Sequence, residues 1–148
     1  MIFSKSFGYA VRGVLYITLM QESKQFVQVE EIAHKLAVPR YFMGKILKKL
    51  VKANMLSSAK GKAGGFTIND HTKQLSLVNL VSITDGLDTF HHCVLCLQEC
   101  NAQNHCPVHD QMNGVRQKLM EVLSATTIND LLKEDKEDFI KSIATLYR

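Results

Sequence analysis

A sharp break between two helix-like segments constrains the fold of this chain more than any other feature. Residues 29–36 place Ile32 and Leu36 at helical spacing. This short helix is predicted to end at Ala37-Val38-Pro39, because a residue before proline avoids helical dihedral angles. A longer helix is predicted from Arg40 to Ala53. The buried stripe of that helix is expected to consist of Phe42, Ile46, Leu47, Leu50 and Val51.

A glycine-rich hairpin is predicted after the second helix. Short strands are expected near Leu56–Lys60 and Gly65–Ile68, with glycines at the tip supplying the positive φ angles of a tight turn. An amphipathic helix over residues 4–21 precedes the pair. This order of elements is typical of a winged helix-turn-helix. The expected fold class is therefore mainly α with a small β-hairpin wing.

Positive charge is concentrated in the same part of the chain. The net charge of the whole chain is +4, yet residues 35–73 contain nine lysines and arginines and a single acid, Asp70. Such a basic face predicts a polyanionic partner, here double-stranded DNA, although a winged helix that contacts proteins remains an alternative. The second helix is expected to enter the major groove and the wing to meet the backbone. The predicted DNA-binding residues are Arg40, Tyr41, Lys45, Lys48, Lys49, Lys60 and Lys62.

A long helix is predicted in the C-terminal third, after a short helix over Leu75–Ile83 with Ser76 as its N-cap. Pro107 fits the first position of the long helix. The 3.5-residue spacing of its apolar residues favours a dimer seam over a plain core helix; these residues are Val108, Met112, Val115, Leu119 and Val122. A capping box at Thr127–Asp130 predicts one more short helix. Phe139, Ile140, Ile143, Leu146 and Tyr147 predict a last amphipathic helix.

All four cysteines, Cys93, Cys96, Cys100 and Cys106, lie in one short stretch, and His109 follows three residues after the last. Zinc and iron–sulfur centres both bind thiolates at such spacing. The presence of only one Cys-x2-Cys pair favours an iron–sulfur cluster, with zinc as the alternative. The N-terminus of the long helix, where Cys106 is expected, favours thiolate.

Other function classes are disfavoured. Mean hydropathy is −0.03, and no segment is apolar enough to span a membrane. No small-residue cleavage site follows the apolar N-terminus, so a cytoplasmic location is expected, where thiols stay reduced. No nucleophile with a convincing base and no phosphate-binding loop is visible, so the chain is not expected to be an enzyme.

Taken together, these motifs give the chain a resemblance to the winged-helix repressors of the iron–sulfur family typified by IscR and NsrR. The matching stretches are "FGYAVRGVLYI", "VEEIAHKLAVPRYFMGKILKKLVKANML", "KGKAGGF", "CNAQNHCPVH" and "TTINDL". The resemblance implies a homodimer that binds a palindromic operator and holds a cluster through Cys93, Cys100 and Cys106.

The resemblance leaves two sources for a fourth ligand. In some members it is a histidine three residues past the last cysteine, which is His109 here, and in others it comes from the first helix of the partner. Residues 1–21 contain no Asp, Glu or His, which favours His109. Three thiolates and one imidazole favour a 2Fe–2S cluster, with 4Fe–4S possible. Cys96 is an additional thiol that could replace His109, act as a resolving thiol or have no specific role.

The expected organisation has three parts: a winged helix-turn-helix over residues 1–88, a cluster-binding loop over 89–107, and a dimerisation helix with C-terminal helices over 108–148. The expected function is a transcriptional repressor that senses redox state, iron or nitric oxide. Two alternatives are a DNA-binding repressor with a structural zinc site and an iron–sulfur carrier protein.

Overall fold

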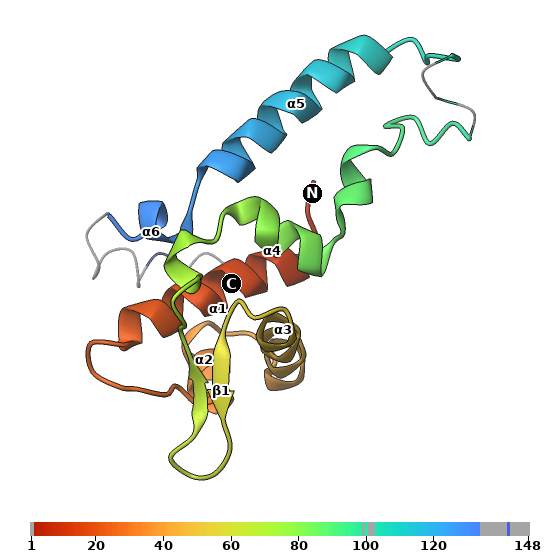
Figure 1. Cartoon of the computed structure of the whole chain (residues 1–148). Helices are drawn as coiled ribbons and strands as arrows, with labels where there is room; N and C mark the ends of the chain where they lie inside the picture. The colour runs from red at the N-terminus through yellow and green to blue at the C-terminus, as the bar shows by residue number, and fades with distance from the viewer. Residues whose placement is uncertain (1, 99, 101–102, 134–141, 143–148) are drawn as a thin grey trace.

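The computed structural model describes residues 2–98, 100, 103–133 and 142 (Figure 1). These residues are mostly helical with one two-stranded antiparallel hairpin, which confirms the predicted fold class. The elements are α1 (Lys5–Met20), α2 (Val29–Lys35), α3 (Arg40–Lys52), β1 (Ser57–Ala59), β2 (Gly65–Thr67), the 3-10 helix η1 (Thr72–Gln74), α4 (Leu77–Thr84), the 3-10 helix η2 (Leu87–Phe90), α5 (His109–Ala125) and α6 (Ile128–Leu131). None of the helices among these residues has the length and hydropathy to cross a bilayer.

Helix α1 lies at the centre of the fold and is buried on more faces than an amphipathic helix would be. It contacts α3 on one side and α4 on another, so Val14, Ile17 and the polar Arg12 are all buried. The Arg12 guanidinium donates to the carbonyl of Leu36 at 3.3 Å, at the end of α2. Helix α1 thus anchors the helix-turn-helix to the rest of the molecule.

The turn between α2 and α3 forms where the proline break predicted it. Ala37 adopts a positive φ of 52°, and the amide of Val38 donates back to the carbonyl of Ala33 at 3.0 Å. The predicted stripe of α3 is wrong at Phe42, which is 53% exposed. Met43 is fully buried instead, because the core-facing positions recur at steps of three and four from Met43, and Phe42 lies one residue, about 100°, outside them.

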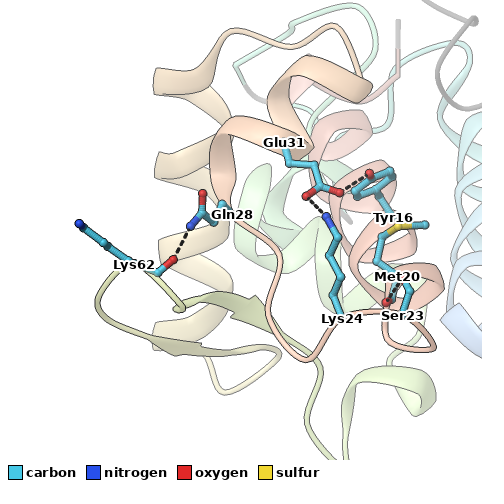
Figure 2. A network of polar contacts seen from close by, with 7 residues as sticks. All are labelled: Tyr16, Met20, Ser23, Lys24, Gln28, Glu31 and Lys62. Atoms are coloured by element: carbon cyan, nitrogen blue, oxygen red, sulfur yellow. Dashed lines mark hydrogen bonds and ion pairs between the residues drawn. The ribbon is translucent and has the colours of Figure 1, made fainter.

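The wing is joined to the body of the protein by its second strand. Ser58 pairs with Phe66 in the hairpin, and Phe66 also exchanges two backbone hydrogen bonds of 2.8 Å with Val27. Figure 2 shows a further link, in which the Gln28 side-chain amide donates to the Lys62 carbonyl at 2.8 Å. The position of the wing is therefore tied to the residues that begin α2.

A second set of contacts fixes α2 to α1 (Figure 2). The Tyr16 hydroxyl donates to Glu31 at 2.8 Å, and Lys24 forms an ion pair with the same carboxylate. The hydrogen bond from Lys24 is the largest cause that lowers the pKa of Glu31 below its usual value. Burial, followed by the bond to Glu31, raises the pKa of Tyr16.

Helix α5 leaves the body of the protein and carries the cysteine loop at its far end (Figure 1). It begins at His109 rather than at Pro107, because Pro107 and Val108 form a turn. Its C-terminal part packs on α4, where Leu123, Val81 and Phe90 form a small second core.

The capping box predicted at the start of α6 is confirmed. The Thr127 hydroxyl accepts from the Asp130 amide, and the Asp130 carboxylate accepts from the Thr127 amide at 2.9 Å. The start of α4 lies beside this segment, because Leu77 donates to the Thr126 carbonyl and Ile128 donates to the Leu75 carbonyl, each at 2.9 Å. The amphipathic helix predicted over residues 139–147 falls outside the described residues.

Candidate metal centre and nucleic-acid interface

Three cysteines approach one another at the outer end of α5. The sulfur atoms of Cys93, Cys100 and Cys106 lie within 4.8 Å of one another, and the Cys93 and Cys106 sulfurs are 3.8 Å apart. All three residues are partly buried. Cys96 is exposed and does not belong to this group, and its backbone has a positive φ of 55°.

His109 lies beside this group of thiols. As the first residue of α5, it places its Nδ1 3.4 Å from the Cys100 sulfur. The four predicted ligand residues are thus neighbours although they come from a loop and a helix.

The environment of the thiols favours partial ionisation. Backbone hydrogen bonds from Leu97 and then Leu95 lower the pKa of Cys93 to about 7. At Cys100 a backbone hydrogen bond from Cys106 acts to lower the pKa, but burial and the neighbouring thiols of Cys106 and Cys93 outweigh it, so the pKa is raised. A group in which one thiol ionises near neutral pH is suited to binding a cation, because the thiolate is the form that binds metal.

The donor set fits a tetrahedral metal centre. Metal–sulfur bonds of about 2.3 Å at a tetrahedral ion separate two sulfur ligands by about 3.8 Å. The observed separation of the Cys93 and Cys106 sulfurs is 3.8 Å. Zinc, and an iron atom that binds two cysteines in an iron–sulfur cluster, both use such thiolate ligands, so the distance between this pair of sulfurs fits either centre.

A second group of donor atoms lies beside the first but does not form a comparable site. His105, His109 and Asp110 are close together, and the two imidazole rings stack at 4.0 Å with an interplanar angle of 10°. The lone pairs of stacked imidazoles lie in parallel planes, so they do not converge on one ion. His109 belongs to this group and also approaches the Cys100 sulfur, so it links the two sets of donor atoms.

The outward face of α3 carries the predicted nucleic-acid contacts. Tyr41, Lys45 and Lys48 follow one another at steps of four and three, on the side opposite the buried residues of the helix. Tyr41 is 68% exposed, and the Lys45 ammonium lies 5.6 Å from the centroid of its ring. Phe42 contacts the Tyr41 ring edge-on at 5.6 Å.

The remaining predicted contacts flank this face. Lys49 is exposed on α3, and Lys60 and Lys62 are exposed at the tip of the wing. Arg40 differs from them because its guanidinium is paired with Glu30 of α2 at 2.6 Å. Glu30 was not among the residues predicted from the sequence. Its only signal in the sequence was its type and position, an acid in the first turn of α2, the helix that precedes the basic helix α3.

Comparisons with known proteins agree with this architecture. The family model named Rrf2, described as an iron-dependent transcriptional regulator, matches residues 3–134. The chain belongs to the Rrf2 family. This Rrf2 protein is 30% identical over 142 residues to an HTH-type transcriptional regulator of Aquifex aeolicus (strain VF5), covering 94% of this chain and 97% of that protein. It is 26% identical over 131 residues to protein aau3 of Rhizobium meliloti (strain 1021), covering 88% and 84% of the two chains.

Solved structures of similar fold include two regulators. CymR, the global cysteine regulator of B. subtilis, superposes with a TM-score of 0.71 at 16% identity, covering 87% of this chain and 94% of that one. An IscR of T. potens gives a TM-score of 0.70 at 18% identity, covering 91% and 88%. Membership of the Rrf2 family identifies the chain as a transcriptional regulator that acts on DNA and not as an enzyme.

Proposed function

We propose that this Rrf2 protein is a homodimeric, cytoplasmic repressor that binds a palindromic operator and senses redox state, iron or nitric oxide through an iron–sulfur cluster. The observation that carries the proposal is the convergence of Cys93, Cys100 and Cys106, whose sulfurs lie within 4.8 Å of one another. The proximity of the His109 Nδ1 to this group supports three thiolates and one imidazole as the ligand set.

The connection from this centre to the DNA-binding face runs through α5. When bound, an iron–sulfur cluster supplies a centre whose stability and charge respond to electrons and small oxidants. His109 is the first residue of α5, and the C-terminal part of α5 packs on α4, which in turn contacts α1. A rearrangement of the cysteine loop would therefore change the position of α5 relative to the winged helix-turn-helix.

The metal can be identified directly. The protein isolated without oxygen is expected to absorb visible light and to contain iron and acid-labile sulfide, with a 2Fe–2S cluster favoured over 4Fe–4S. A colourless protein containing zinc would instead support a repressor with a structural zinc site. The same geometry fits that second candidate, because the Cys93 and Cys106 sulfurs are 3.8 Å apart.

The ligand set is tested by substitution. Cys106→Ser is expected to abolish the visible absorbance, since one of three converging thiolates is lost. Cys96→Ser is the matched control, because Cys96 is exposed and lies outside the group. Full colour in Cys106→Ser, or bleaching in Cys96→Ser, would contradict the ligand assignment. Retention of the full cluster in His109→Ala would make Cys96 the candidate for the fourth ligand.

Binding to DNA separates this function from that of an iron–sulfur carrier. Lys45, Lys48 and Lys49 are exposed on α3 and are expected to neutralise phosphates. Specific binding to genomic fragments should therefore weaken between low and high salt, because condensed counterions are released when phosphates are contacted. Electrophoretic mobility shifts at two salt concentrations measure this effect. The absence of any specific, salt-sensitive complex would favour the carrier.

A further inference from the structure

The guanidinium of Arg40 is held by a carboxylate before any DNA is present. Arg40 Nε donates to Glu30 Oε1 at 2.7 Å, and Nη2 lies 2.6 Å from the same oxygen. The two side chains remain 65% and 57% exposed. An exposed ion pair of this kind contributes little to stability, so its main physical effect is on the orientation of the two side chains.

The pairing engages one edge of the guanidinium and leaves another available. A guanidinium is planar and has five N–H groups, and Glu30 engages the edge formed by Nε and Nη2. The edge formed by Nη1 and the second proton of Nη2 is a planar two-donor fork. This fork matches O6 and N7 of guanine, the two acceptors that guanine presents in the major groove.

The space beside the pair is open to a ligand. Arg40 and Glu30 line an open hollow of about 330 Å³ together with Gln28, Val29 and the wing glycines Gly61, Gly64 and Gly65. No side chain projects from these glycines into the hollow. The pair thus lies at the start of α3 and beside the wing, and these are the two elements proposed to contact the duplex.

We propose that Arg40 reads a guanine in the major groove and that Glu30 is the positioning residue that orients it. This inference rests on the proposed DNA-binding function. A free arginine loses much of its rotamer entropy on binding, whereas one fixed in advance loses less. A carboxylate on a face that meets phosphates opposes binding to every sequence alike. Because Glu30 Oε1 is engaged by the Arg40 guanidinium, Glu30 adds specificity by acting through Arg40.

The test compares affinities for two versions of one operator. An operator is first selected from random duplexes with the full-length protein isolated without oxygen. Each guanine is then replaced by 7-deazaguanine, which lacks the N7 acceptor. We expect one guanine in each half-site whose replacement weakens wild-type binding by about fivefold or more. Arg40→Ala is expected to bind both versions of the operator equally.

Glu30→Ala separates positioning from simple repulsion. It is expected to lose most of the discrimination between guanine and 7-deazaguanine, while its affinity for random duplex rises because a negative charge has gone. Glu30→Gln retains an oxygen acceptor for Arg40 Nε and should restore part of the discrimination. Lys49→Ala is the control, since loss of a phosphate contact weakens both operators alike. Circular dichroism of each variant establishes that it is folded.

The outcomes test separately the role of Glu30, the role of Arg40 and the proposed DNA-binding function. Discrimination equal to wild type in both Glu30 variants overturns the positioning role. A 7-deazaguanine effect that persists in Arg40→Ala overturns the assignment of Arg40 as the guanine reader. A wild-type protein that selects no duplex at all overturns the proposed DNA-binding function itself, and this inference with it.

Discussion

Gly65 lies where the wing returns to the body of the protein, and a side chain has no room there. Its φ angle is +139°, and a Cβ atom at this position would lie 2.5 Å from the carbonyl oxygen of Val27. That carbonyl accepts the hydrogen bond from the Phe66 amide that joins the wing to the body. Gly61, at the tip of the wing, also has a positive φ of +98°, but nothing lies within 4 Å of its missing Cβ.

These two glycines predict different costs for the same substitution. Gly65→Ala is expected to lower the free energy of unfolding by more than about 2 kcal/mol, because conformational strain is added to a backbone clash. Gly61→Ala is the control and should cost only the strain, about 1 kcal/mol. Urea denaturation measures both. Equal destabilisation in the two variants would contradict the clash.

Residue type and spacing predicted the contacts of some side chains in the candidate sites and the core but not of others. Cys93, Cys100 and Cys106 could be grouped in advance because thiols have few other roles at such spacing. The pairing of Arg40 with Glu30 could not be predicted, because this contact depends on how α2 is rotated against α3. The burial of Met43 rather than Phe42 depends on how α3 is rotated against α1, where the Met43 sulfur approaches Gly13.

At the scale of single elements, α6 shows how a four-residue helix is maintained. Its capping box uses Asp130, whose carboxylate accepts hydrogen bonds from the backbone and side chain of Thr127 and pairs with Lys133. The backbone hydrogen bond from Thr127 is the largest cause that holds the pKa of Asp130 well below its usual value. Ile128, the first residue of α6, is fully buried.

The lowered pKa of Asp130 predicts a pH dependence. Because the folded-state pKa is depressed, the carboxylate stabilises the fold at pH values above its unfolded pKa, about 4. This stabilisation is lost as the pH falls through the folded-state pKa. The difference in melting temperature between wild type and Asp130→Asn should therefore shrink from about pH 6 towards about pH 2. Asp70→Asn, an exposed site, is the control for charge, and an equal difference at all pH values would contradict the cap.

Element boundaries were less predictable than element types. The sequence placed Pro107 at the first position of the long helix, a common site for proline. In the structure Pro107 and Val108 form a turn and α5 begins at His109. Periodicity indicates which residues share a face, but the start of a helix depends on local contacts, here those of the cysteine loop.

At the scale of the whole molecule, α5 has two apolar sides. Leu123 faces α4, in the second core. Val115 and Val122 remain 57% and 50% exposed. The predicted seam is therefore divided: part of it is covered within the chain, and the exposed valines remain for the proposed dimer.

The exposed valines predict the response of the dimer to substitution. Val122→Glu is expected to shift the protein towards monomer without unfolding it, because a charge would be buried in the interface while the monomer core is untouched. Gln117→Glu, on the opposite face of α5, is the control for charge. Analytical ultracentrifugation measures both. A dimer of unchanged stability in Val122→Glu would place the interface elsewhere.

The two hydrogen bonds between the start of α4 and the start of α6 make the chain from Leu77 to Thr126 a closed loop with a fixed base. The 17 residues of α5 form a rigid arm on that base, about 25 Å long at 1.5 Å per residue. A displacement of the outer tip by one ångström corresponds to a tilt of roughly 2° at the fulcrum. A small displacement of the three cysteines at the outer tip of α5 would therefore tilt the whole helix. The tilt would be felt where the helix meets α4 and the start of α6.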